Sequence, residues 1–286
     1  MTLVLMAPAK LNLGLEVIGR RPDGYHDLCS IMVSISLADS VELSPGAGLM
    51  LGGPHAEGVP HGPSVNLAGR ALAELEAIAG RSLGQALSLT KNVPAGAGLG
   101  GGSADAGAVL RAAAQLGVDA DRDRLLEAAV ALGADVPFQS VGGTALVRGL
   151  GERITPLHHV DIWFAVAYPG VPVSTADVFA ELTEEEWSDG EIVAAAARQL
   201  EQGPLEIGDL TVLPNALWGP ATRRFPMLAQ AVGRLRGAGW RPRLTGSGSA
   251  MYHASEDEAE ARSLTAAAAG LGFATWTCHT LPAHDW

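Results

Sequence analysis

The residues best suited to phosphate chemistry are concentrated between Lys91 and Ala106, in the sequence KNVPAGAGLGGGSADA. Five of these sixteen residues are glycine, and the segment leads into an Ala-rich stretch, 104–116, that we expect to be helical. The first N–H groups of a helix have no partners within the helix, and the helix dipole places positive charge beside them. A glycine-rich loop that opens a helix is therefore a natural phosphate site.

Other interpretations of this loop remain open from the residues alone. It is not a P-loop, because the chain contains no G-x-x-x-x-G-K-[ST]. Gly96, Gly98 and Gly101 have the G-x-G-x-x-G spacing of a dinucleotide site, but Pro94 and the preceding lysine do not suit that fold. A flexible linker is the remaining alternative, although linkers do not open directly onto an apolar helix. We expect Ser103 to cap the helix and to offer its hydroxyl to a phosphate.

The two lysines of the chain, Lys10 and Lys91, both lie in or beside such segments, whereas every other basic residue is arginine. A compact ammonium has uses that a planar guanidinium cannot serve, so we expect both lysines to be functional. Lys10 lies in the strand-like sequence APAKLNL at 7–13, where alternation places Lys10 and Asn12 on one face. The alternative is an ordinary surface lysine.

Two further segments carry isolated polar groups in apolar surroundings. GADVPF at 133–138 places Asp135 just beyond a predicted helix end, where it is either a functional carboxylate or a turn residue. TGSGSA at 245–250 is a second Gly/Ser loop between predicted strands, and alone it predicts only a tight turn.

Composition limits the class of protein. The 286 residues are 48% hydrophobic, with no apolar run of the ~18–20 residues that a bilayer span needs and no basic start typical of a signal peptide. Cys29 and Cys278 are too few for a disulfide framework or a metal site. A net charge of −12 argues against nucleic acid or an anionic membrane as partner. We therefore expect a cytoplasmic protein. We also expect it to be a monomer or a weak homodimer.

The hydrophobic patterning predicts an α+β fold. Strands are expected at 3–6, 11–18, 31–36, 40–43, 86–90, 144–147 and 163–167, and near Arg243, Met251 and 274–277. Helices are expected at 64–79 (capped by Ser64), 121–133, 192–201, 226–236 and 256–269, and loops at 44–63 and 202–209. A domain boundary is predicted near residue 150, giving units 1–150 and 151–286.

Four segments carry a family resemblance when they are taken in order: 7–13, the glycine loop at 91–106, 133–138 and 245–250. They resemble the small-molecule kinases of the galactokinase, homoserine kinase, mevalonate kinase and phosphomevalonate kinase superfamily. Within it, the chain is most similar to the kinases of the non-mevalonate isoprenoid pathway that act on a cytidyl diphosphate. The similarity rests on PAKLNL at 8–13, RPDGYH at 21–26, GADVP at 133–137 and YPGV at 168–171, and it extends from residue 7 to about 255.

The resemblance implies two α+β lobes with the active site between them: an N-terminal ATP-binding lobe like the second domain of ribosomal protein S5, and a ferredoxin-like C-terminal lobe. It implies ATP and Mg²⁺ as cofactors and Lys10 and Asp135 as the catalytic pair. The implied ATP-binding residues are Lys91, Pro94, Ala95, Gly96, Ala97, Gly98, Leu99, Gly100, Gly101, Gly102, Ser103 and Ala104. The implied substrate-binding residues are Asn12, Tyr25, His26, Thr175 and Phe179. Met32 occupies a position where a phenylalanine often completes the substrate pocket.

Three rival functions remain. Another kinase of the superfamily would keep the loops but would not need the DGYH segment. A non-catalytic nucleotide-binding module would be expected to lose Lys10 or Asp135, and both are present. An oxidoreductase is disfavoured because the acidic residue that binds ribose is missing.

Overall fold

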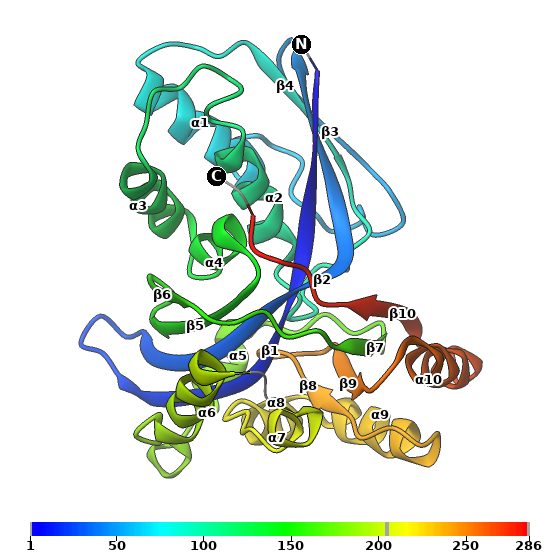
Figure 1. The fold of residues 1–286 in the computed structure, drawn as a ribbon. Coiled ribbons are helices and arrows are strands. Elements are labelled where there is room, and N and C mark those ends of the chain that lie inside the picture. Colours follow the sequence, from blue (N-terminus) through cyan, green and yellow to red (C-terminus); the bar gives the residue numbers. More distant parts are fainter. Residues whose placement is uncertain (1, 204–205, 285–286) are drawn as a thin grey trace.

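A long two-stranded ribbon organises the molecule (Figure 1). In this computed structural model, which describes residues 2–203 and 206–284, the ribbon consists of β1 (Leu3–Arg20) and β2 (His26–Pro45). The sequence predicted four shorter strands here, which is wrong, because the antiparallel pairing continues from Leu3–Leu43 to Arg20–His26. Register shifts, rather than breaks, accommodate the irregular positions, and they fall between Pro8 and Lys10, Asn12 and Gly14, and Val17 and Gly19.

The first sheet is built around β2. Its order is β3-β4-β2-β5-β6, with β1 paired to β2. The further strands are β3 (Leu49–Gly52), β4 (Gln85–Thr90), β5 (Thr144–Gly149) and β6 (Arg153–Pro156). The prediction of a loop throughout 44–63 is wrong for β3, which pairs in parallel with β4 despite its Gly- and Pro-rich surroundings.

Helices of the first half of the chain cover one face of this sheet (Figure 1). They are α1 (Leu67–Ala79), α2 (Gly101–Arg111), α3 (Arg122–Leu132) and α4 (Val136–Val141). The predicted ends of α3 are confirmed, since Asp121 accepts from the Arg124 amide and Gly133 is the C-cap. Two predicted caps are wrong: Asn66 caps α1 instead of Ser64, and α2 begins at Gly101 with Gly100 in the left-handed region as N-cap, which leaves Ser103 within the first turn.

The second sheet is antiparallel, with the order β10-β7-β9-β8. Its strands are β7 (Trp163–Tyr168), β8 (Arg243–Leu244), β9 (Met251–Ser255) and β10 (Ala274–His279). The remaining helices are α5 (Thr175–Ala180), α6 (Glu191–Gln202), α7 (Ile207–Thr211), α8 (Trp218–Arg224), α9 (Pro226–Gly237) and α10 (Glu258–Gly270), with a short 3₁₀ turn at Glu184–Glu186. The loop predicted at 202–209 lies partly outside the described residues, at 204–205, and α7 begins within it.

The half of the ribbon nearer the β1–β2 turn joins the two sheets through one continuous core. Leu11 and Leu13 of β1 and Ile31 of β2 are buried in the same cluster as Phe164 of β7 and Tyr252 of β9. The first sheet continues to Pro156 and the second begins at Trp163, and a domain division at residue 150 stays a prediction. None of the helices in the described residues is both long enough and apolar enough to cross a membrane.

Candidate active site

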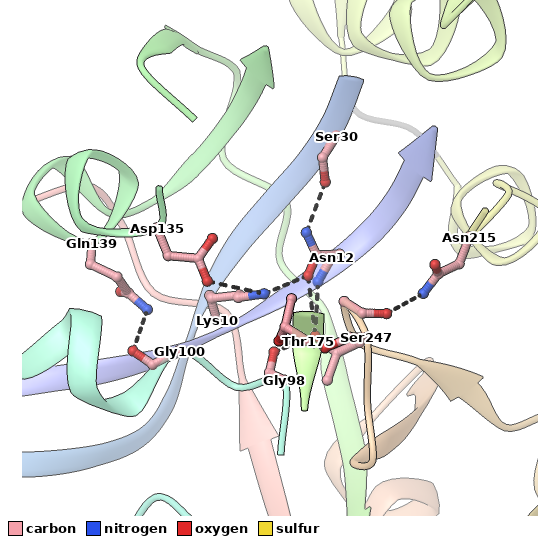
Figure 2. Close-up of polar contacts among 12 residues, drawn as sticks. Lys10, Asn12, Ser30, Gly98, Gly100, Asp135, Gln139, Thr175, Asn215 and Ser247 are labelled. Atoms are coloured by element: carbon pink, nitrogen blue, oxygen red, sulfur yellow. Dashed lines mark hydrogen bonds and ion pairs between the residues drawn. The ribbon is translucent and has the colours of Figure 1, made fainter. Parts of the chain in front are cut away.

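Lys10, Asn12 and Asp135 converge where the ribbon passes the start of α4 (Figure 2). The Lys10 ammonium donates to Asn12 Oδ1 at 2.6 Å and lies 3.6 Å from Asp135 Oδ2. The predicted common face for Lys10 and Asn12 is thereby confirmed, and Lys10, only 4% exposed, is not an ordinary surface lysine. Asp135 occupies the N-cap position of α4 without capping it, and its side chain is one-third exposed. A carboxylate open to solvent therefore faces a buried cation.

Asn12 is held by two other segments, which fixes its amide. Its Nδ2 donates to Ser30 Oγ on β2, and the Ser30 hydroxyl donates to the Gly14 carbonyl. Thr245 Oγ1 accepts from the Asn12 backbone N–H at 3.2 Å and is 3.2 Å from the Gly98 carbonyl. Thr245 therefore links the TGSGSA loop to both β1 and the glycine loop, which is more than the tight turn predicted from sequence.

The glycine loop is packed between β1 and the second half of the chain. The Lys10 N–H donates to the Leu99 carbonyl, the Ala250 N–H to the Ala97 carbonyl and the Val173 N–H to the Gly96 carbonyl. Glycine is required at Gly98, where φ is +76° and a Cβ atom would lie 2.2 Å from the Thr245 carbonyl oxygen. An ordered loop with these contacts is not a flexible linker. Ala95, Gly96 and Gly102 remain exposed, so parts of the loop are open to a ligand.

Sequence reasoning missed two polar side chains that support these loops (Figure 2). Gln139, buried on α4, donates to the Gly100 carbonyl at 3.4 Å. Asn215 donates to the carbonyls of Leu244 and Gly246. Gln139 lies four residues after Asp135, on the same side of a helix, and this spacing was the available signal. Nothing comparable marks Asn215.

Lys91 does not lie with Lys10. Its ammonium is buried beneath the glycine loop and forms ion pairs with Asp39 and Asp105, both of which are also buried. Its predicted role in binding the nucleotide stays a prediction, but the charge that would serve it is already engaged by two carboxylates.

Four of the five predicted substrate residues, Tyr25, His26, Thr175 and Phe179, line one cavity of about 1350 Å³, whereas Asn12 does not line it. The rings of His26 and Phe179 stack with their centroids 5.2 Å apart, and Thr175 lies one helical turn before Phe179 on α5. Tyr25 borders the same cavity but is 66% exposed. Thr175 is also hydrogen-bonded to Ser247, which connects the cavity to the TGSGSA loop. Partial burial, with a smaller effect of Arg20, lowers the pKa of His26 and so favours the neutral imidazole, which can both donate and accept.

Met32 does not line this cavity. It is 4% exposed and packs with Phe138, Ala145 and Val147, between β2, β5 and α4. Its contribution is therefore to the packing behind α4, the helix that Asp135 precedes.

The geometry as a whole suits transfer of a phosphoryl group. A partly exposed carboxylate can accept a proton, a buried ammonium lies beside it, and a glycine loop at a helix start offers N–H groups to phosphate oxygens. A large cavity with aromatic walls adjoins these groups and can hold the rest of an acceptor molecule.

Comparison with known proteins agrees with this class of chemistry. A family model described as the N-terminal domain of GHMP kinases matches residues 66–143. The 4-diphosphocytidyl-2-C-methyl-D-erythritol kinase of Geobacter sp. (strain M21) is 39% identical over 271 residues, covering 92% of this chain and 93% of that protein. The Thermus thermophilus protein of the same name is 40% identical over 258 residues, covering 90% of this chain and 89% of that protein. A solved structure of a 4-(cytidine 5'-diphospho)-2C-methyl-D-erythritol kinase superposes with a TM-score of 0.79 at 37% identity, covering 97% of this chain and 99% of that one.

Fold, site and family model together define an ATP-dependent small-molecule kinase of the GHMP class, with the two-sheet α+β architecture of that class. At nearly 40% identity over nine-tenths of its length, the chain belongs to the family of 4-diphosphocytidyl-2-C-methyl-D-erythritol kinases.

Proposed function

We propose that this protein transfers the γ-phosphoryl group of ATP to the 2-hydroxyl group of 4-diphosphocytidyl-2-C-methyl-D-erythritol, in the non-mevalonate route to isoprenoid precursors. The observation that carries the proposal is the meeting of Lys10, Asn12 and Asp135 at the glycine loop, beside a cavity walled by His26 and Phe179. The family relationship supports the same reaction.

In this proposal Asp135 is the general base. It accepts the proton of the substrate hydroxyl as the oxygen attacks the γ-phosphorus, while the bond from the γ-phosphorus to the β,γ-bridging oxygen breaks and ADP leaves. Such a base contributes a factor of ~10²–10⁴ in rate. The Lys10 ammonium, 3.6 Å away, orients the carboxylate and offsets charge on the transferring group. Asn12 Oδ1 accepts from the same ammonium and so fixes its direction. The attacked alcohol is tertiary, so orientation matters as much as basicity.

The glycine loop is proposed to hold the triphosphate. Its ordered backbone, its exposed residues Ala95, Gly96 and Gly102 and the start of α2 provide a place where phosphate oxygens can approach main-chain N–H groups. The residues that we assign to ATP are those of the segment from Pro94 to Ala104. Lys91 lies beneath this segment and supports it from below.

Mg²⁺ suits this site as a companion of ATP rather than as a metal held by the protein. Among residues 2–203 and 206–284, no group of three His, Cys, Asp or Glu side chains is placed to hold a metal ion. Mg²⁺ usually keeps several waters and binds through nucleotide phosphates, so the triphosphate itself would supply the main ligands of the ion here. When bound, the ion would neutralise charge on the triphosphate.

The aromatic cavity is proposed to bind the cytidyl group. Tyr25 and Phe179 offer two ring faces for stacking on cytosine, and the neutral His26 can hydrogen-bond to its polar edge. Thr175 and Asn12 complete the predicted substrate contacts.

Side-by-side assays test the proposal. ATP consumption is measured with the cytidyl diphosphate substrate, with mevalonate and with homoserine at equal concentrations. We expect turnover with the cytidyl substrate only. Comparable or faster turnover of mevalonate or homoserine would identify a different acceptor and would overturn the proposal.

A further inference from the structure

The buried Lys91 lies at the junction of three segments beneath the glycine loop. Lys91 itself follows β4, Asp39 belongs to β2, and Asp105 lies on α2, the helix that the loop opens. The three side chains are 3%, 0% and 2% exposed, and the ammonium contacts one oxygen of each carboxylate. We refer to Lys91, Asp39 and Asp105 as the buried triad.

Asp39 holds the start of the loop directly. Its Oδ1 accepts from the backbone N–H groups of Asn92 (2.5 Å) and Val93 (2.8 Å), while its Oδ2 faces the ammonium. The Asn92 side chain also donates to the Ala38 carbonyl, so the start of the loop is bonded to this stretch of β2 a second time. The two residues that precede Pro94 are therefore fixed to the first sheet.

Asp105 holds the far end of the loop. It lies one turn into α2, so its contact with Lys91 anchors the helix start that carries Gly101 and Gly102. The packing at this point is close, because a Cβ atom on Gly101 would lie 3.0 Å from Val93 and 3.2 Å from Asp39. One ammonium thus connects the segment before the loop with the helix after it.

The buried triad differs from a simple structural ion pair in its charge balance, because it holds two acidic groups and one basic group. Two carboxylates share one ammonium, and Asp105 Oδ1 has no hydrogen-bond partner among the described residues. Burial in the presence of Asp39 raises the pKa of Asp105 to about 7. An arrangement that is costly to bury can persist when it fixes one conformation, and here the segment it fixes is the glycine loop.

We infer that Lys91 is a positioning residue: with Asp39 and Asp105 it holds both ends of the glycine loop at the spacing that ATP requires, without contacting the nucleotide through its side chain. The inference rests on the proposed assignment of this loop to ATP. It gives the second lysine of the chain a function different from that of Lys10.

The test measures binding of the Mg²⁺ complex of AMP-PNP, a non-hydrolysable ATP analogue, by calorimetry. This readout does not involve the acceptor alcohol, so failure of the cytidyl substrate assay would leave it interpretable. Asp105→Leu removes the link to α2 while leaving the neutral Lys91–Asp39 pair, and it should weaken binding about tenfold. Asp105→Asn keeps a hydrogen-bond acceptor for Lys91 and should restore binding to within about twofold of the parent.

Two further variants separate positioning of the loop from a general loss of stability and from direct contact with the nucleotide. Val109→Ala lowers the stability of α2 by removing fully buried methyl groups, and it should leave AMP-PNP affinity unchanged. Lys91→Met alone leaves two carboxylates facing each other and is at risk of not folding, so the double variant Lys91→Met/Asp105→Leu is used. Once the link to α2 is cut, the loss of the ammonium should weaken binding by less than a further threefold.

Three results would overturn the inference. A double variant that binds AMP-PNP tenfold more weakly than Asp105→Leu would show that the Lys91 side chain acts on the nucleotide independently. Equal weakening by Val109→Ala would reduce the effect to general stability. Unchanged affinity in Asp105→Leu would show that the loop keeps its spacing without the buried triad.

Discussion

The two halves of the candidate active site are built differently. The phosphoryl-transfer half, formed by Lys10, Asp135 and the glycine loop, is held by buried hydrogen bonds and ion pairs from both sheets. The cavity half is walled by aromatic side chains such as His26 and Phe179, and its Tyr25 is two-thirds exposed. We therefore call the first the fixed half and the cavity the adjustable half. Positioning demands of this kind are strictest where bonds are made and broken.

Removing the general base should give the largest loss of turnover, and its effect should be confined to the fixed half of the site. Asp135→Asn keeps the size of the side chain but cannot accept the hydroxyl proton, so turnover should fall by ~10²–10⁴. AMP-PNP binding and the KM for the cytidyl substrate should change by less than about threefold. Steady-state kinetics together with calorimetry checks both statements. If the variant kept a rate within threefold of the parent, Asp135 would be a structural residue.

Lys10→Arg tests whether the space around the Lys10 ammonium can hold a larger cation. The charge is retained, but the Lys10 ammonium already lies 3.3 Å from where a Cβ atom of Gly246 would be, and a wider guanidinium would displace this loop or Asn12. We expect kcat to fall by about tenfold to a hundredfold, with the melting temperature nearly unchanged. A fully active arginine variant would mean that this half is as adaptable as the cavity.

Tyr25→Ala tests the adjustable half. Because the side chain is mostly exposed, its removal should leave the fold intact while eliminating one stacking face, worth ~1–3 kcal/mol. The KM for the cytidyl substrate should rise about tenfold, and the KM for ATP should stay within twofold. Phe179→Ala should act in the same direction but also lower stability, since Phe179 packs against the core of the second sheet. A rise in the KM for ATP alone would contradict the assignment of the cavity.

The smallest expected effect is a pH dependence of stability that arises beneath the loop. The pKa of Asp105 is raised to about 7 by burial and by Asp39, against the opposing charge of Lys91, whereas an unfolded Asp titrates near ~3.9. The folded protein therefore binds this proton more tightly. The resulting stability is fully present below about pH 3.9 and is lost as the pH rises to about 7.

Thermal denaturation of the parent and of Asp105→Asn, followed between about pH 4.5 and pH 7.5, measures this contribution. The melting temperature of the parent relative to the variant should fall as the pH rises. A difference that is constant across this range would place the titration on another group.

The sequence predicted the fixed half well because its parts carry local signals. Glycine density marked the loop that precedes α2, alternation placed Lys10 and Asn12 on one face, and the end of α3 located Asp135. The partners of these residues could not be predicted, because they come from distant segments. Thr245 and Asn215 belong to the second half of the chain, and Asp39 lies on a strand that also carries other acidic residues, so nothing in the sequence distinguishes it.

The fold was predicted in class but not in its longest elements. Alternation is interrupted at the register shifts of β1 and β2, so each strand was divided in two, although pairing with a partner strand carries it across the interruption. The strand β3 was missed because Gly and Pro dominate its surroundings, while Leu49 and Leu51, which pack onto the core, are only two residues. Such features are decided by tertiary contacts rather than by local propensity.

The β1–β2 ribbon also has a mechanical consequence. A chain that crosses between lobes once can bend at that crossing, but here two hydrogen-bonded strands extend through both layers of the molecule and bury residues in the core of each (Figure 1). Opening or closing the lobes would therefore have to bend both strands of the β1–β2 ribbon together. A pair of strands bends most readily where its hydrogen-bonding register shifts, and two of the register shifts of this ribbon flank Lys10 and Asn12. Any change in the angle between the lobes would thus be converted into a displacement of the ammonium that faces Asp135.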